Sequence, residues 1–124
     1  MLRHRSAWLM GGYFLISVVV YLSLVPHPPE PLSFPNSDKL EHGLVYATLS
    51  LWFCQIYSAA RSRVKVIVAL VAMGVVLEIL QGWSGYRYFE YADMLANSMG
   101  VLLGFLLART SLGRAFILIE KLWR

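Results

Sequence analysis

The sequence predicts an all-α polytopic membrane protein, a bundle of four transmembrane helices with both termini in the cytoplasm. Of its 124 residues, 58% are hydrophobic and 15% are charged, whereas soluble domains average roughly 45–50% and about 25%. Four apolar segments approach the roughly 20 residues that a helix needs to cross a bilayer. Helices are expected because a backbone in lipid must satisfy its own hydrogen bonds. The predicted spans are about residues 7–25, 41–60, 64–82 and 92–109.

The first apolar segment follows a basic N-terminus and resembles a signal peptide. Its apolar part, residues 7–25, is longer than the roughly 7–15 residues of a signal-peptide core. The following "LVPHPP" is a poor cleavage site, so we expect an uncleaved first span. The proline-rich stretch "PHPPEPLSFPNS" then predicts an extended loop. We expect residues 1–124 to form a single domain.

The positions of the basic residues predict which ends of the spans face the cytoplasm. Nine of the eleven Lys and Arg residues lie in the N-terminus, in "RSRVK" after the second span, and in the tail. The two others are Lys39 and Arg87. The positive-inside rule places the three basic regions in the cytoplasm and the first and third loops outside. We therefore expect a multi-pass protein of the bacterial cytoplasmic (inner) membrane. The tail, residues 111–124, predicts a short amphipathic helix on the inner surface.

The sequence supports neither a nucleic-acid-binding protein nor a protein stabilised by an internal disulfide. The net charge of +4 comes from basic residues at the ends of apolar segments, without the basic stripe or motifs of a nucleic-acid-binding protein. Cys54 is the only cysteine, so no internal disulfide can form. It lies within an apolar segment and is expected to be a small buried residue.

Polar residues of the last three spans recur at helical spacing, so each group lies on one face of its helix. The predicted topology brings the three groups together at the outer end of the bundle. Ionisable residues within a membrane usually face the protein interior and mark functional sites, whereas glycines allow helices to approach closely. The sequence therefore predicts a shared polar site near the outer interface. The groups are Asp38, His42 and Tyr46; Gly74, Glu78, Gln81 and Gly85; and Asp93, Asn97, Gly100 and Gly104.

The stretches "DKLEHGLVY" (38–46) and "EILQGWSGYRYFEYADMLANSMGVLLG" (78–104) resemble the VanZ-like membrane proteins. The ordered set of polar residues and glycines, rather than any single motif, carries the resemblance. The founding member of that family is associated with low-level resistance to the glycopeptide teicoplanin. The resemblance thus implies a membrane fold and an effect on glycopeptide susceptibility, but it brings no established reaction.

The candidate catalytic residues are Glu78, His42 and Asp93. A carboxylate inside the membrane needs a partner or a proton, and two carboxylates in different environments can divide acid and base roles. A histidine can exchange a proton at neutral pH. Arg87 and Lys39 are suited to hold a phosphate or carboxylate. The full set of candidate substrate-binding residues is Arg87, Gln81, Asn97, Asp38, Lys39 and Tyr46.

We expect this site to bind, or act on, an envelope lipid or a lipid-linked cell-wall glycan. Whether it catalyses a reaction as a hydrolase or transferase is left open. The alternative is a non-enzymatic membrane scaffold whose polar residues fix the packing of the helices. Asp38 could also serve as a helix N-cap with Glu41 as its capping-box partner.

A divalent metal is a further alternative for the same residues. Asp38, His42, Glu78 and Asp93 are of the types that bind such ions. The set holds a single histidine, however, and the sequence lacks an H-E-x-x-H motif. We therefore expect no cofactor.

Overall fold

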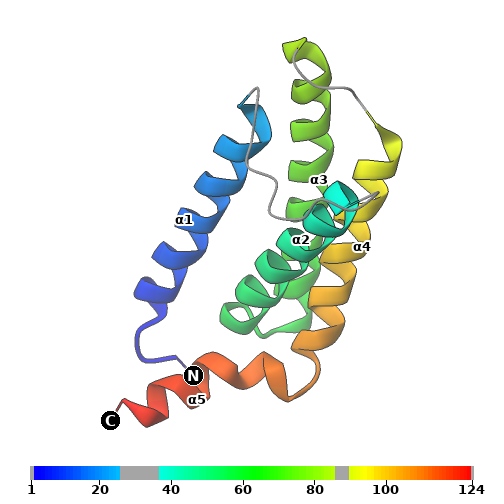
Figure 1. Ribbon diagram of the computed structural model, residues 1–124. Coiled ribbons are helices and arrows are strands. Elements are labelled where there is room, and N and C mark those ends of the chain that lie inside the picture. The colour runs from blue at the N-terminus through cyan, green and yellow to red at the C-terminus, as the bar shows by residue number, and fades with distance from the viewer. Residues whose placement is uncertain (1, 26–36, 86–89, 124) are drawn as a thin grey trace.

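The chain is all-α, as the sequence predicts, in a computed structural model that describes residues 2–25, 37–85 and 90–123 (Figure 1). The described residues contain no strand. Four long helices run alternately up and down, and a short helix crosses one end, where both chain termini lie (Figure 1). The elements are α1 (Arg5–Leu24), α2 (Ser37–Ile56), α3 (Ala60–Ser84), α4 (Tyr91–Ala108), the 3₁₀ helix η1 (Ser111–Arg114) and α5 (Ala115–Leu122).

Three of these helices, α1, α3 and α4, are long and apolar enough to cross a membrane. Helix α2 has 20 residues, the same length as α1, but its first two turns carry Asp38, Lys39, Glu41 and His42. Those residues lower its average hydrophobicity, and much of the rest of the helix is covered by protein. A fourth span through α2 therefore remains a prediction.

Helix α2 forms the centre of the bundle and supplies most of the buried core. Tyr46, Leu49 and Phe53 of α2 pack with Leu70 of α3 and Val101 of α4 in one hydrophobic cluster. Each of these side chains is less than 9% exposed. Because α2 is enclosed by its neighbours, polar groups along it are held at fixed positions within the bundle.

Helices α2 and α4 approach so closely that their backbones nearly touch. A Cβ atom at Gly100 would overlap the carbonyl oxygen of Gly43, and one at Gly104 would overlap the carbonyl oxygen of Ala47. Ser50 adds a hydrogen bond across the same interface, since its Oγ donates to the Val101 carbonyl at 2.7 Å. This contact fixes the register of α4 against α2 and therefore the heights of the polar groups at their ends.

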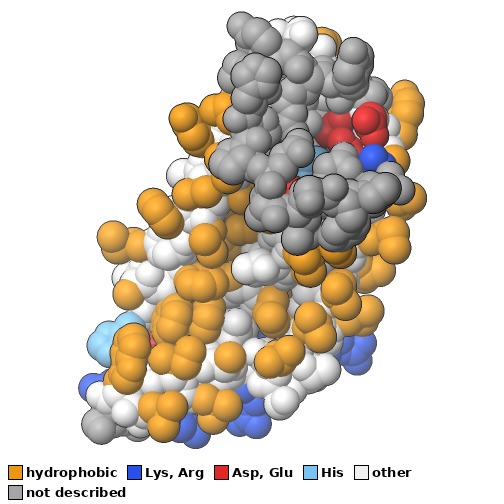
Figure 2. Space-filling view, in the orientation of Figure 1, with side chains coloured by type: hydrophobic (Ala, Val, Ile, Leu, Met, Phe, Trp, Pro, Cys, Tyr) orange, Lys and Arg blue, Asp and Glu red, His pale blue; other side chains and the backbone are white. Residues whose placement is uncertain are grey.

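The two ends of the bundle differ in charge. On the face seen in Figure 2, lysine and arginine side chains gather along the end that α5 crosses, whereas acidic side chains lie near the opposite end. This is the separation that the sequence predicts for the cytoplasmic and outer ends.

Candidate functional site

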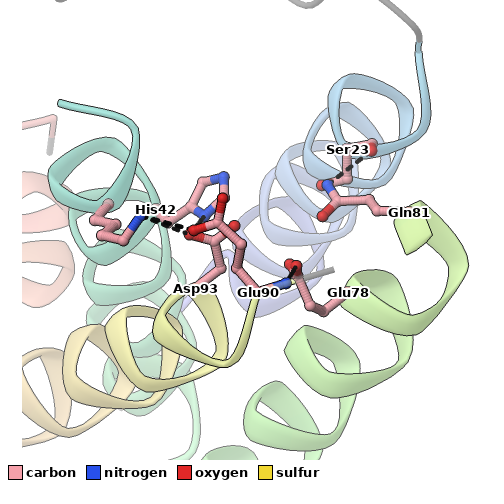
Figure 3. Close-up of polar contacts among 7 residues, drawn as sticks. Ser23, His42, Glu78, Gln81, Glu90 and Asp93 are labelled. Carbon is pink, nitrogen blue, oxygen red and sulfur yellow. Dashed lines mark hydrogen bonds and ion pairs between the residues drawn. The ribbon is translucent and has the colours of Figure 1, made fainter. Parts of the chain in front are cut away.

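Polar side chains from three helices meet at the end of the bundle opposite α5 (Figure 3). His42 comes from α2, Glu78 from α3 and Asp93 from α4. His42 Nδ1 lies 3.9 Å from Asp93 Oδ1, and their side chains are 24% and 9% exposed. The predicted convergence of helices α2, α3 and α4 therefore occurs, with the imidazole at the more accessible side of the group.

Lys39 lies between two carboxylates at the start of α4. Its Nζ is 2.9 Å from Glu90 Oε2 and 3.6 Å from Asp93 Oδ1. Asp93 occupies the first turn of α4, where the helix dipole favours a negative charge. The charge of Lys39 is thus largely offset within the protein. A ligand anion would have to compete with these carboxylates for Lys39.

Glu78 joins α3 to the beginning of α4. The backbone N–H of Glu90, which precedes α4, donates to Glu78 Oε1 at 2.8 Å (Figure 3). Glu78 is only 2% exposed, and burying a carboxylate is costly unless hydrogen bonds compensate it. The hydrogen bond from Glu90 supplies part of that compensation. Glu78 therefore stabilises the packing of α3 against the start of α4, whether or not it also takes part in a reaction.

Asn97 and Tyr46 form the floor of the site. Both are buried, at 5% and 4% exposure. Gly74 of α3 makes room for them, because a Cβ there would lie 3.2 Å from Asn97 Nδ2 and 3.4 Å from the Tyr46 ring. Among the described residues, Asn97 Oδ1 and His42 Nδ1 are buried atoms without a hydrogen-bond partner. Buried polar atoms are normally hydrogen-bonded, so Asn97 Oδ1 is available to a ligand or to water, whereas His42 Nδ1 faces Asp93 Oδ1 at 3.9 Å.

Gln81 lies at the same end of the bundle but faces a different helix. Its Nε2 donates to the carbonyl of Ser23 on α1 at 2.8 Å (Figure 3). The side chain is therefore engaged in holding α3 to α1. Arg87 and the side chain of Asp38, both predicted to bind substrate, lie outside the part of the chain that the structure describes.

Glu90 is a site residue that the sequence analysis missed. Its carboxylate holds Lys39, and its N–H binds Glu78. Its position in the sequence could have revealed it. Glu90 stands directly before α4 and three residues ahead of Asp93, so the two acidic side chains lie on the same side of the helix. With Glu90 included, the described part of the site carries more acidic than basic side chains.

The described residues contain no group of three or more His, Cys, Asp and Glu side chains arranged to hold a metal ion. The His42–Asp93 pair offers the site a group that can exchange protons. A carboxylate beside one ring nitrogen orients an imidazole, which leaves the other nitrogen to exchange a proton with a bound group.

Comparisons with known proteins identify a family and a relative of this chain. A family model described as VanZ/LLP1 matches residues 32–114, more than half of the chain. The uncharacterized protein C11E3.10 of Schizosaccharomyces pombe is 31% identical over 96 residues, which are 75% of this chain and 57% of that protein. The chain thus spans little more than half the length of this relative. No solved structure matches the chain. The family match contains both stretches that carried the resemblance, and the chain belongs to the VanZ/LLP1 family.

Proposed function

We propose that this protein is a four-span membrane protein whose polar site opens to the outer side and binds, or acts on, an envelope lipid or a lipid-linked cell-wall intermediate. The observation that carries the proposal is the meeting of His42, Glu78 and Asp93, from three different helices, at the end opposite the basic residues. Ionisable groups placed at such depth are rarely retained without a function.

The proposed orientation rests on the distribution of charge. The end crossed by α5 holds both termini, the α2–α3 connection and the first turns of α3, which carry Arg61, Arg63 and Lys65. Basic residues favour the cytoplasmic side, so the polar site belongs at the outer surface of the bacterial cytoplasmic membrane. An outer site at interfacial depth can reach the head group of a lipid whose chains stay in the bilayer.

The proposed chemistry uses the His42–Asp93 pair as a proton acceptor for a hydroxyl group or a water molecule. Glycans and lipid head groups both offer hydroxyl groups, and Asn97 Oδ1 can accept a hydrogen bond from one of them. Arg87 is proposed to bind a ligand phosphate through its guanidinium group. Lys39 and Glu90 would then position Asp93 rather than hold the ligand.

Native mass spectrometry of the protein in lipid nanodiscs tests this proposal. We expect the wild type to carry an anionic lipid or a lipid-linked sugar that His42→Gln and Arg87→Ala lose. His4→Gln, the same exchange at the opposite end of the molecule, should keep the ligand. A wild-type protein that carries neither class of ligand would contradict the proposal.

Turnover of the captured ligand separates enzyme from binding protein. A change in ligand mass that requires His42 indicates a hydrolase or transferase, whereas an unchanged ligand indicates binding alone. Susceptibility of cells to teicoplanin, with and without the gene, measures the resistance role that the family suggests. An effect that His42→Gln abolishes would tie that role to this site.

A structural scaffold is the second candidate function. Two bonds favour it: Glu78 binds the start of α4, and Gln81 binds the end of α1. If these groups serve packing alone, Glu78→Gln and Gln81→Leu should lower the Tm of the purified protein, and no ligand should be found. Retained stability together with lost ligand would favour the binding site instead.

A further inference from the structure

A second feature lies at the other end of the bundle, where a groove of about 400 Å³ runs between α1, α2 and α3. Tyr13 and Ile16 of α1 form one side, and residues 62–70 of α3 form the other. Tyr13 is 57% exposed, and Lys65 and Ala69 are also exposed. The groove is therefore open at the surface of the bundle, on the side that would face lipid.

The lining of the groove changes from polar to apolar along its length. Ser62, Lys65 and the Tyr57 ring lie at the end near the α2–α3 connection, whereas Ile16 and Leu70 lie deeper. Residues 62 and 70 of α3 are separated by about 12 Å along the helix axis, less than half of the roughly 30 Å hydrocarbon thickness. The groove thus has the length and polarity of one lipid leaflet.

The polar end of the groove is positively charged. Lys65 lines it, and the guanidinium of Arg5 lies 5.0 Å from the centre of the Tyr57 ring, which also lines it. No acidic side chain is among the described residues of the lining. A phosphate group at this end would meet two cations and the hydroxyl of Ser62, an arrangement that suits an anionic head group.

We propose that this groove binds one anionic phospholipid, with an acyl chain along Ile16, Phe53 and Leu70 and the phosphate at Lys65 and Ser62. The proposal is separate from the outer polar site. The orientation proposed above would place this lipid in the cytoplasmic leaflet, and only that placement depends on the proposed orientation. Such a lipid would fill the space between α1 and α3 and couple the position of α1 to the composition of the membrane.

Lipid competition in nanodiscs tests the head-group half of this proposal. The protein is released from nanodiscs with equal amounts of phosphatidylglycerol and phosphatidylcholine of identical chains, and the retained lipids are identified by native mass spectrometry. We expect one retained lipid, mainly phosphatidylglycerol. Lys65→Gln should reduce its retention about fivefold, the contribution of one lysine near an anionic surface. Lys121→Gln, an exposed charge outside the groove, should not.

Ala69→Phe tests the acyl-chain half, because a ring at this position would fill the groove. We expect it to abolish retention of phosphatidylglycerol and of phosphatidylcholine alike, whereas Ala72→Phe, an exposed position on the same helix outside the lining, should leave retention unchanged. Lys65 is exposed, so Lys65→Gln remains informative if Ala69→Phe does not fold. Equal losses in the Lys65 and Lys121 variants would overturn the proposal. So would a dimer that Ala69→Phe abolishes, since a second copy would then occupy the groove.

Discussion

Gly100 and Gly43 set how closely α4 can approach α2. A Cβ on Gly100 would overlap the Gly43 carbonyl oxygen, while a Cβ on Gly43 would meet the Ala96 carbonyl oxygen at 3.6 Å, an ordinary contact. The two glycines face each other, but only at Gly100 is there no room for a Cβ atom. This asymmetry is a direct consequence of the register between the two helices.

Gly100→Ala is therefore expected to destabilise the protein by about 1–3 kcal/mol, as overpacking of a close contact does. Gly43→Ala should be neutral or slightly stabilising, because alanine favours a helix over glycine by roughly 0.8–1.0 kcal/mol. Thermal unfolding in detergent, followed by circular dichroism, measures both. Equal destabilisation by the two substitutions would contradict the packing described.

At the residue scale, side-chain identity and spacing predicted that polar groups of α2, α3 and α4 meet at one end of the bundle, as His42, Glu78 and Asp93 do. Asp93 and Asn97 lie on one face of α4 because positions four residues apart share a helix face. The partners were harder to predict. Lys39 binds Glu90 and Asp93, and Gln81 reaches Ser23, because such contacts depend on distances between helices that spacing within one helix does not set.

At the scale of elements, α5 fastens the N-terminus to the rest of the molecule. The Glu120 carboxylate accepts hydrogen bonds from the backbone N–H groups of Arg3 at 2.7 Å and His4 at 3.0 Å, and from Trp8 Nε1 at 2.9 Å. The Trp8 ring stacks on Phe116 with their centres 3.9 Å apart. Helix α5 thus holds the first turns of α1 at the basic end.

These bonds alter the acidity of Glu120. Burial acts to raise the pKa of the carboxyl, but the hydrogen bonds from His4, Arg3 and Trp8, together with the charge of His4, outweigh it and bring the pKa below its ordinary value of 4.5. A lowered pKa in the folded state means that Glu120 stabilises the fold above pH 4.5 and loses this contribution as the pH falls through its own pKa.

Glu120→Gln should therefore lower the Tm at pH 7, because a neutral amide accepts these hydrogen bonds less strongly than a carboxylate. The difference in Tm between wild type and variant should stay constant from pH 7 to about 5 and then shrink on further acidification. A series of thermal melts across this range measures it. A difference that grows at acidic pH would contradict the assigned role of Glu120.

The sequence predicted the existence of the four long helices more accurately than the residues at which they begin. Helix α2 begins at Ser37, whereas the apolar segment that predicted it begins at residue 41. Helix α3 likewise begins at Ala60 rather than residue 64. In both cases charged residues occupy the first turns, and a search for apolar segments leaves them out although they continue the helix.

At the scale of the whole molecule, the chain has two chemically distinct ends. Both termini and most of the described lysines and arginines lie at one end (Figures 1 and 2), and the His42–Asp93 pair, at the first turns of α2 and α4, lies at the other. Composition and charge were enough to predict this arrangement. The sequence predicts a short amphipathic helix in the tail, but the contacts that dock α5 could not be predicted, because Glu120 and Phe116 meet residues more than a hundred positions away.

The account centres on a polar site that faces outward, and cysteine labelling in intact cells tests this most directly. In a Cys54→Ala background, which removes a fully buried thiol, Tyr91→Cys marks the polar end and Ser58→Cys the basic end. Tyr91 is 78% exposed, and Ser58 is also exposed. We expect a membrane-impermeant maleimide to label residue 91 in intact cells, and residue 58 only after permeabilisation. Labelling of residue 58 alone in intact cells would place the polar site in the cytoplasm and contradict the account.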